Sequence, residues 1–300
     1  MPFSVFGVLA RLGLSALATY SGQSIFPLAY AQATGCLIMG FCLALKEPFS
    51  RYYPPLYTAL TTGFCGSLTT FSGWQLDIFK SWLNVGNAPR SALSDVMDGL
   101  CKTVFTFSIS LASLLFGMHI ASEISPYFRP APAPGKSFQR FISVLGVCTY
   151  AATLPAYFLL PRDYRHRATS ALLFSFPGTL TRYLLSTLLN TALPAFPLGT
   201  YTANASGTAL LGTFHVLQST TSRVLSPASC TVLQGLGDGY CGCLTTVSTF
   251  AAEIATLKTA AHKYRYALGT WVTGQLILVL IVGSLVWSGA VGKDQTCSFD

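Results

Sequence analysis

Two twelve-residue strings of similar composition stand far apart in this chain. Residues 63–74 read GFCGSLTTFSGW, and residues 239–250 read GYCGCLTTVSTF. Glycine and hydroxyl residues are poor helix formers, so each string predicts a local break in a helix. Carbonyls released at such a break can coordinate a cation, whereas released N–H groups, hydroxyls and aromatic ring edges suit an anion. The alternative interpretation is close helix packing through small residues.

The composition predicts that these breaks lie inside a membrane. Of the 300 residues, 51% are hydrophobic and only 9% are charged, whereas a soluble domain carries about 25% charged residues. A run of about 20 apolar residues spans a bilayer core. We expect nine spans, near residues 3–22, 27–45, 54–79, 97–122, 139–160, 168–190, 198–218, 228–256 and 265–289.

The spans form two copies of one four-helix unit. The matching elements, in the same order in both copies, are GVLARL and GTLTRY at 7–12 and 178–183, AQATG and ANASG at 31–35 and 203–207, Gly40 and Gly212, the two strings, and Asp77 and Glu253 after them. A repeat of this kind indicates one structural unit used twice. Two strings at equivalent places favour a functional break over packing alone.

A single extra span joins the copies and inverts one relative to the other. Four spans return the chain to the side from which it started, and a fifth crosses again after a proline-rich linker at 129–136 that cannot be regular helix. We therefore divide the chain into a first repeat (1–126), a linker with the connecting helix (127–165) and a second repeat (166–300). Inverted repeats are a transport architecture with the site near the midplane.

The net charge of +8 does not indicate a nucleic-acid partner, because the basic residues are scattered in short clusters between apolar runs. They fit the headgroup regions of a lipid bilayer. Their distribution over the two sides shows almost no bias, so the orientation stays open. Arg11, Arg182 and Lys102 lie within or near spans, where a charge is either functional or reaches the headgroups.

Most of the nine cysteines lie in apolar runs, where a free thiol behaves as a small hydrophobe. We expect no disulfide framework. The spacing of the cysteines and of the four histidines indicates no metal site made of side chains. The N-terminal apolar run lacks a basic segment before it, so no cleaved signal peptide is expected.

Two spans carry hydroxyl groups on one helix face, because their spacings alternate between three and four. In the fourth span these positions are Thr103, Thr106, Ser110, Ser113 and Gly117, and in the last span they are Tyr266, Thr270 and Thr273. Such hydroxyls either replace water around a small anion or bond a neighbouring helix.

The strings resemble the signature of the Fluc/CrcB fluoride channels, and the double copy joined by one helix is similar to the fused eukaryotic exporters of the FEX type. The resemblance covers nearly all of the chain outside the linker. It implies a passive, fluoride-selective channel with two antiparallel pores, completed within one chain and exporting cytoplasmic fluoride at the plasma membrane. It also implies a central structural sodium bound by the backbone carbonyls of Gly66, Thr69, Gly242 and Thr245.

In this family two phenylalanines of the string line each pore with their ring edges, one from each unit. The first copy has Phe71 and Trp74 at these positions, and the second has Val247 and Phe250. Valine has no polarised ring edge, and indole is larger than benzene. Pairing across the copies therefore gives an intact pore with Phe71 and Phe250 and a degenerate pore with Trp74 and Val247.

The resemblance also implies the polar lining. The family's pore asparagine corresponds to Asn204, assigned to the intact pore, and to Gln32, assigned to the degenerate one. The hydroxyls assigned to the fluoride pore are Thr70, Ser72, Ser110, Ser113, Thr246, Ser248, Thr270 and Thr273. The structural charges are Arg11, Arg182, Asp77 and Glu253.

The alternative function is an ion-coupled transporter of a small anion or molecule on the same inverted-repeat fold. It would need a titratable carboxylate near the midplane, and Asp77, Asp238 and Glu253 are the candidates. No phosphate-binding loop, serine–histidine pair, paired aspartates in the spans or zinc-binding helix motif indicates an enzyme. The sequence therefore predicts a channel without catalytic activity.

Overall fold

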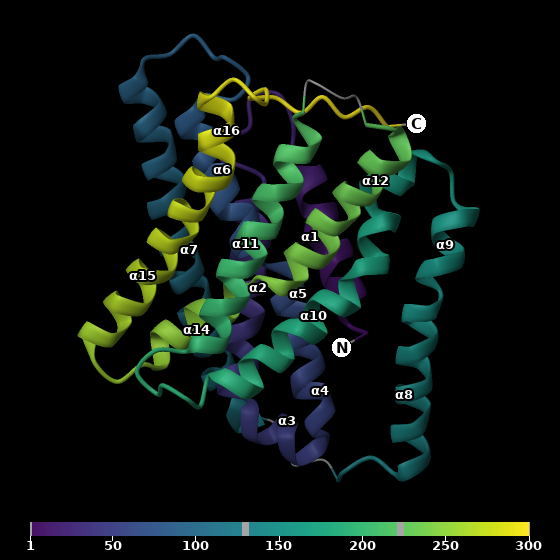
Figure 1. Ribbon diagram of the computed structural model, residues 1–300. Coiled ribbons are helices and arrows are strands. Elements are labelled where there is room, and N and C mark those ends of the chain that lie inside the picture. The colour runs from purple at the N-terminus through teal and green to yellow at the C-terminus, as the bar shows by residue number, and fades with distance from the viewer. Residues whose placement is uncertain (1, 128–131, 221–224, 300) are drawn as a thin grey trace.

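The computed structural model describes residues 2–127, 132–220 and 225–299, and within these ranges the chain is helical (Figure 1). The β-structure of these ranges is limited to one isolated bridge, between Thr220 and Val291. The predicted all-helical class is confirmed.

The first copy of the four-helix unit runs from α1 to α7. Its elements are α1 (Ser4–Ala18), α2 (Leu28–Ala44), α3 (Lys46–Tyr52), α4 (Pro54–Thr58), a π-helical segment (Ala59–Cys65), α5 (Gly66–Leu68), α6 (Phe71–Leu83) and α7 (Ala92–Ile124). Helices α2 and α7 pack closely because both carry glycine at the crossing. A Cβ atom at Gly40 would collide with the backbone of Leu114, and one at Gly117 with the backbone of Leu37.

The second copy repeats this order. Its elements are a π-helical segment (Arg165–Thr169), α10 (Ser170–Leu189), α11 (Leu198–Gln218), α12 (Pro227–Gly235), a π-helical segment (Leu236–Cys241), α13 (Gly242–Leu244), α14 (Ser248–Thr256), α15 (Ala260–Leu278), a π-helical segment (Val279–Gly283) and α16 (Ser284–Trp287). Helices α12, α13 and α14 thus correspond to α4, α5 and α6.

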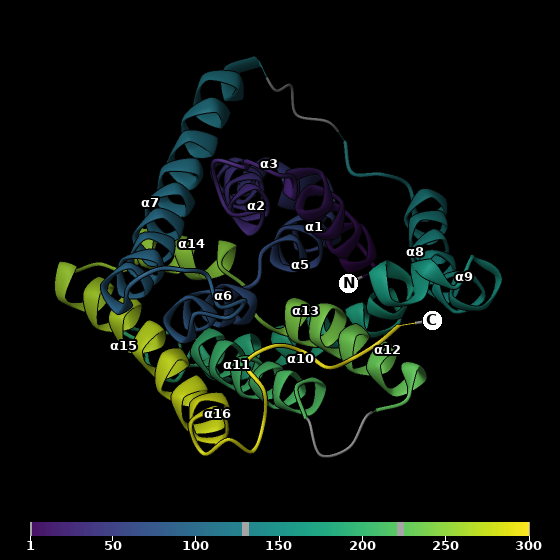
Figure 2. The same ribbon diagram turned by 90° about the horizontal axis from the view of Figure 1, so that it is seen from above.

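The predicted break is present in both strings. Thr69 has a ψ of 148° and Thr70 a φ of −140°, so the chain is extended between α5 and α6. Thr245 has a ψ of 154°, which ends α13 in the same way. The short helices α5 and α13 contact each other and lie near the middle of the bundle (Figure 2).

Helices α8 (Lys136–Ala151) and α9 (Thr153–Leu159) connect the copies and stand at the edge of the bundle, away from α7 and α15 (Figure 2). None of the residues of α8 is buried, so this span contributes little to the core. The predicted proline-rich linker falls partly on residues 128–131, which lie outside the described residues. Its described part, 132–135, has no regular structure.

By length and composition, three helices of the described ranges can cross a bilayer: Ala92–Tyr127, Lys136–Leu159 and Ala260–Trp287. The pair Leu28–Ala44 and Lys46–Tyr52, bent by 72°, would make a fourth. Two of the other predicted spans are interrupted by the breaks, and α1 has only 15 residues. The expected number of nine spans is therefore not reached by this criterion.

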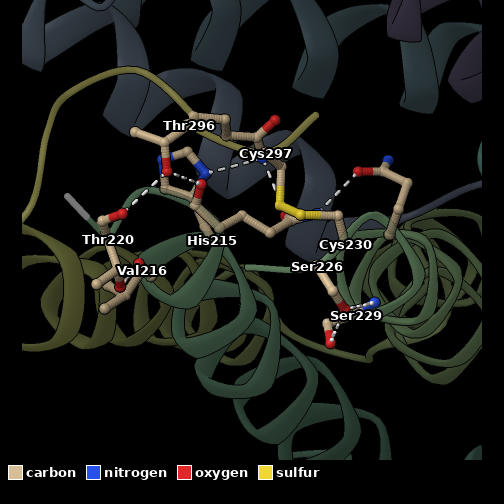
Figure 3. The surroundings of a disulfide bond; sticks show 11 residues. His215, Val216, Thr220, Ser226, Ser229, Cys230, Thr296 and Cys297 are labelled. Atoms are coloured by element: carbon tan, nitrogen blue, oxygen red, sulfur yellow. Dashed lines mark hydrogen bonds between the residues drawn. A yellow bond between two sulfur atoms is a disulfide. The ribbon is translucent and has the colours of Figure 1, made fainter. Parts of the chain in front are cut away.

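Cys230 and Cys297 form a disulfide bond (Figure 3). The prediction of no disulfide was wrong. It failed because the two cysteines are 67 residues apart in sequence, and nothing in the polar C-terminal segment indicates where it folds. That segment crosses the upper end of the molecule in Figure 1.

Candidate functional site

The two helix breaks bond each other through threonine hydroxyls. Thr69 Oγ1 accepts the backbone N–H groups of Val247, at 3.2 Å, and Ser248, at 3.0 Å. Thr245 Oγ1 accepts the N–H of Ser72 at 3.1 Å. Each hydroxyl therefore satisfies N–H groups at the start of the other copy's helix, which a helix cannot satisfy by itself.

The remaining hydroxyls of the strings complete a buried cluster. Thr69 Oγ1 lies 3.2 Å from Thr246 Oγ1, and Thr70 Oγ1 lies 3.0 Å from Thr245 Oγ1. Ser72 Oγ lies 3.0 Å from Thr245 Oγ1. Thr70 also accepts a bond from Gly73 N at the start of α6. Thr70, Ser72 and Thr246, predicted to line the pore, thus meet Thr69 and Thr245, predicted as sodium ligands, between the two copies.

The two predicted structural arginines are buried and bridge the copies. Arg11 donates to the carbonyl oxygens of Ser67, at 2.9 Å, and Gly242, at 2.8 Å, and also to that of Asp238. Arg11 is only 4% exposed and Arg182 only 2%, so neither reaches the headgroups.

Arg182, in the second copy, likewise bonds one carbonyl of its own copy and one of the other copy. It donates to the carbonyl oxygens of Cys243 and Thr62, both at 2.8 Å. Glycine is required where the guanidinium groups pass: a Cβ atom at Gly66 would collide with Arg182, and one at Gly242 with Arg11.

The predicted sodium ligands fit a cation in part. The carbonyl oxygens of Thr69 and Thr245 accept no hydrogen bond from the described residues, so they are available as ligands. The carbonyl oxygen of Gly242 already accepts a bond from Arg11, and a guanidinium repels a second cation nearby. Thr69 and Thr245 are thus better suited than Gly66 and Gly242.

The two carboxylates that follow the strings have different surroundings. Glu253 accepts bonds from Tyr266 Oη at 2.5 Å, Thr200 Oγ1 at 2.7 Å and Asn190 Nδ2 at 3.1 Å. Asp77 instead lines a cavity of about 430 Å³.

This cavity, which we call the vestibule, has both positively and negatively charged side chains in its wall. Its lining includes Arg11, Thr70, Asp77, Lys80, His215 and Gln295. Its wall therefore includes residues of both the break in the first string and the C-terminal segment.

The predicted pore amides hold the breaks. Asn204 Nδ2 donates to Thr246 O at 3.2 Å, and its Oδ1 accepts the N–H of Thr246 at 2.9 Å. Gln32 Nε2 donates to Thr70 O at 2.8 Å, while its Oε1 has no partner among the described residues. Both amides are fully buried, so each fixes the extended segment of its own copy.

The four aromatic and aliphatic positions of the strings meet in one cluster. Phe71 and Phe250 contact edge to face, with ring centroids 5.5 Å apart. Phe71 also contacts Trp74 at 5.5 Å. Phe250 further contacts Phe107 and Tyr266.

A small cavity beside this cluster, the α7 cavity, lies between α7 and α14. It has a volume of about 10 Å³, and its lining includes Trp74, Thr106, Ser110, Val247, Phe250 and Ala251. Trp74 and Val247, predicted to line a separate degenerate pore, lie in the wall of this cavity together with Phe250 and Ser110, because α7 packs against both α6 and α14.

The two helix faces that carry hydroxyl groups, one on α7 and one on α15, differ in their surroundings. On α7, the hydroxyls of Thr106 and Ser110 are buried beside the α7 cavity and have no partner among the described residues. On α15, Thr270 donates to the carbonyl of Tyr266, and Thr273 bonds Tyr201 Oη at 3.1 Å. Ser113 is half-buried. Unpartnered hydroxyls are therefore found on the α7 side.

A buried amide pair, Gln75 with Gln275, was not predicted from the sequence. Gln275 Nε2 donates to Gln75 Oε1 at 2.6 Å and to the Gln75 carbonyl at 3.1 Å. Gln75 directly follows the first string, where the second copy has Ala251. Comparing residues just beyond the strings would have found this difference.

The fold and the site define an all-helical protein of two similar units, whose broken helices meet at the centre through hydroxyls and arginines. The chain belongs to the family of the CrcB-like protein, Camphor Resistance (CrcB), whose family model matches residues 1–118 and 169–288.

Curated relatives support this membership over nearly the whole chain. Fluoride export protein 1 of Neurospora crassa is 34% identical over 99% of this chain and 67% of its own length. Fluoride export protein 1 of Candida albicans is 33% identical over 97% of this chain and 79% of its own. A 72-residue stretch, 24% of this chain and 59% of the relative, is 46% identical to Fluoride-specific ion channel FluC 1 of Staphylococcus aureus. No solved structure matches the chain.

Proposed function

We propose that this chain is a fluoride channel that exports fluoride passively across a membrane. The observation that carries the proposal is the meeting of two helix breaks at the centre of a chain whose relatives are named as fluoride exporters and channels. The chain is accordingly an ion channel, not an enzyme. The antiporter alternative is not favoured, because the relatives are named as fluoride exporters and a fluoride-specific ion channel.

Fluoride is strongly hydrated, so a pore must supply hydrogen-bond donors or positive edges throughout. The hydroxyls of Thr106 and Ser110, unpartnered among the described residues, are such donors, and they lie beside the Phe250 ring in the α7 cavity. A cavity of about 10 Å³ is comparable to the space that one water-sized particle needs. We assign the dehydrated part of the pathway to this cavity, with Phe71 next to it.

The two copies form the channel as inverted repeats within one chain of nine spans. Two observations support this arrangement: Arg11 and Arg182 make reciprocal bonds to equivalent carbonyls of the other copy, and a single helical connection, α8 with α9, joins the copies. Export of a toxic anion requires the outer boundary of the cell, so we place the channel in the plasma membrane.

A structural sodium between the breaks remains part of the proposal. The carbonyls of Thr69 and Thr245 would be its main ligands, because nothing among the described residues bonds them. When bound, the ion would hold the two breaks together.

Growth of a fluoride-sensitive cell tests the proposed function. A bacterial strain without its own fluoride channel should grow in millimolar-range fluoride when it produces this chain, and it should fail to grow with an empty vector. Equal growth inhibition in both strains, with the chain detected in the membrane, would refute the proposal.

A further inference from the structure

The two copies can be aligned by their helix contacts, and this alignment identifies the counterpart of the α7 cavity. Gly40 packs against Leu114 of α7, and the equivalent Gly212 packs against Leu278 of α15. The contact of Gly40 is with the backbone of Leu114 and that of Gly212 with the side chain of Leu278. Pairing these two leucines gives an offset of 164 (278 minus 114), and the same offset pairs Thr106 with Thr270 on the two helix faces that carry hydroxyl groups. Ser110 and Leu111 then correspond to residues 274 and 275.

In the α7 cavity, the wall includes Ala251, Ser110 and Leu111. All three side chains are small or aliphatic. The hydroxyl of Ser110 has no hydrogen-bond partner among the described residues. Together they leave a space.

The counterparts of these three residues are Gln75, Gly274 and Gln275, and here a side chain occupies the equivalent position. The Gln75 side chain lies over Gly274, where a Cβ atom would be 2.8 Å from Gln75 Oε1. Gln275 Nε2 bonds that same oxygen at 2.6 Å. Gln75 is fully buried and Gln275 is 5% exposed. The amide pair thus occupies the position equivalent to the cavity.

Packing stability alone does not account for this pair. Gln75 Nε2 and Gln275 Oε1 have no partner among the described residues, and a buried polar atom without a partner is destabilising. Alanine and leucine, present at the same places of the other copy, would carry no such cost.

We propose that the Gln75–Gln275 pair closes the second ion pathway, so that fluoride crosses only on the α7 side. This inference rests on the proposed function. The carboxamides fill the space with a neutral, mutually bonded pair of side chains. Gln75 and Gln275 are accordingly residues that determine which of two similar pathways conducts.

Exchanging the side chains between the pathways tests this inference. Ala251→Gln should lower fluoride efflux from liposomes at least tenfold by filling the α7 cavity. Adding Gln75→Ala and Gln275→Leu to that variant should restore at least half of the wild-type rate. The matched control is Gln23→Ala, at an exposed glutamine. Full efflux by Ala251→Gln, or no recovery in a triple variant that elutes as a folded monomer, would overturn the inference.

A second measurement avoids any variant that folds poorly. In a Cys101→Ser, Cys148→Ser background, which removes the two exposed thiols, methyl methanethiosulfonate is added after purification to Ala251→Cys or Gln75→Cys. The reagent should block efflux through Ala251→Cys and leave at least the wild-type rate in Gln75→Cys. The reverse pattern, or equal inhibition, would contradict the closure. Absence of fluoride flux in the wild-type chain would instead refute the proposed function.

A different observation concerns the orientation of the chain. The C-terminal segment is fixed by the Cys230–Cys297 disulfide and by bonds to the end of α11 (Figure 3). Thr296 N donates to Gln218 O at 2.8 Å, and Gln295 Nε2 donates to Gln218 Oε1 at 3.0 Å. Gln295 also lines the vestibule. The segment therefore forms part of the vestibule's wall.

We infer that the vestibule opens to the outside of the cell. Disulfides persist in oxidising compartments and are rare in the cytosol, so the face that carries Cys230–Cys297 is extracytoplasmic. The start of α8, at the other end of the molecule in Figure 1, is then cytoplasmic. This assignment settles an orientation that the scattered basic residues leave open.

Labelling with a membrane-impermeant maleimide tests the orientation in intact cells. In the same background, Ser288→Cys, near the C-terminal segment, should be labelled, whereas Ser137→Cys, at the start of α8, should be labelled only after permeabilisation. Both serines are exposed. The opposite pattern would overturn the inference, and so would mass spectrometry that finds Cys230 and Cys297 reduced in purified membranes.

Discussion

At the scale of single residues, Phe250 lies in the wall of the candidate pathway. Its ring contacts Phe71, Phe107 and Tyr266, and it lines the α7 cavity. A ring edge carries positive partial charge, which an aliphatic side chain of similar bulk lacks.

We therefore expect Phe250→Ile to slow fluoride efflux from liposomes by roughly tenfold, equivalent to about 1.4 kcal/mol in the barrier. Phe138→Ile, at a position of α8 that is 48% exposed, is the matched control and should conduct normally. Unchanged efflux through Phe250→Ile would show that the ring edge has no part in conduction.

Arg182 differs from the exposed basic residues because its guanidinium bonds two backbone carbonyls inside the protein. Lysine carries the same charge but cannot reproduce a fork of donors. Arg182→Lys should lower the free energy of unfolding by about 2 kcal/mol, as expected for lost bonds to a charged group. Thermal unfolding in detergent measures this loss. Arg51→Lys, at an exposed pair with Glu47, should leave the melting temperature unchanged; an equal shift in both would count against the bridging role.

At the scale of helices, the reciprocal caps join the two copies. Thr69→Val removes an oxygen that accepts two N–H groups of the other copy's helix start. We expect a loss of about 1–2 kcal/mol in stability, measured by the same thermal unfolding. Thr69→Ser retains the oxygen and should unfold close to the wild type. Similar losses in both variants would mean that the methyl group, and not the cap, is what matters.

The breaks themselves could be predicted from sequence, because glycines and hydroxyls act locally on helix propensity. The reciprocal caps could not, since Thr69 and Ser248 are bonded across a distance of 179 residues in the chain. The shared cavity wall of Trp74, Val247 and Phe250 could not be predicted for the same reason: it depends on the position of α7, which no local pattern gives. The disulfide required the path of the C-terminal segment.

At the scale of the whole molecule, two copies in one chain can diverge, and their differences lie where the copies meet α7 and α15. Gln75 faces Gly274 in one place, and Ala251 leaves a cavity in the other. A chain whose halves are fused needs only one conducting pathway.

The proposed sodium belongs to this scale, because it would bind both copies at once. A ligand that binds only the folded state stabilises it by mass action. The melting temperature should therefore be higher in sodium chloride than in an equal concentration of N-methylglucamine chloride. Equal melting temperatures would remove the sodium from the account without affecting the pathway.

Fluoride efflux from liposomes that contain the purified chain tests the central claim most directly. The vesicles should hold fewer than one chain on average and have equal pH on both sides, so that neither a second chain nor a proton gradient can assist. A fluoride electrode should record rapid, passive efflux down the fluoride gradient, and a chloride electrode should record almost none in parallel vesicles. Chloride efflux as fast as that of fluoride, or fluoride efflux that appears only with an imposed proton gradient, would contradict a passive fluoride channel.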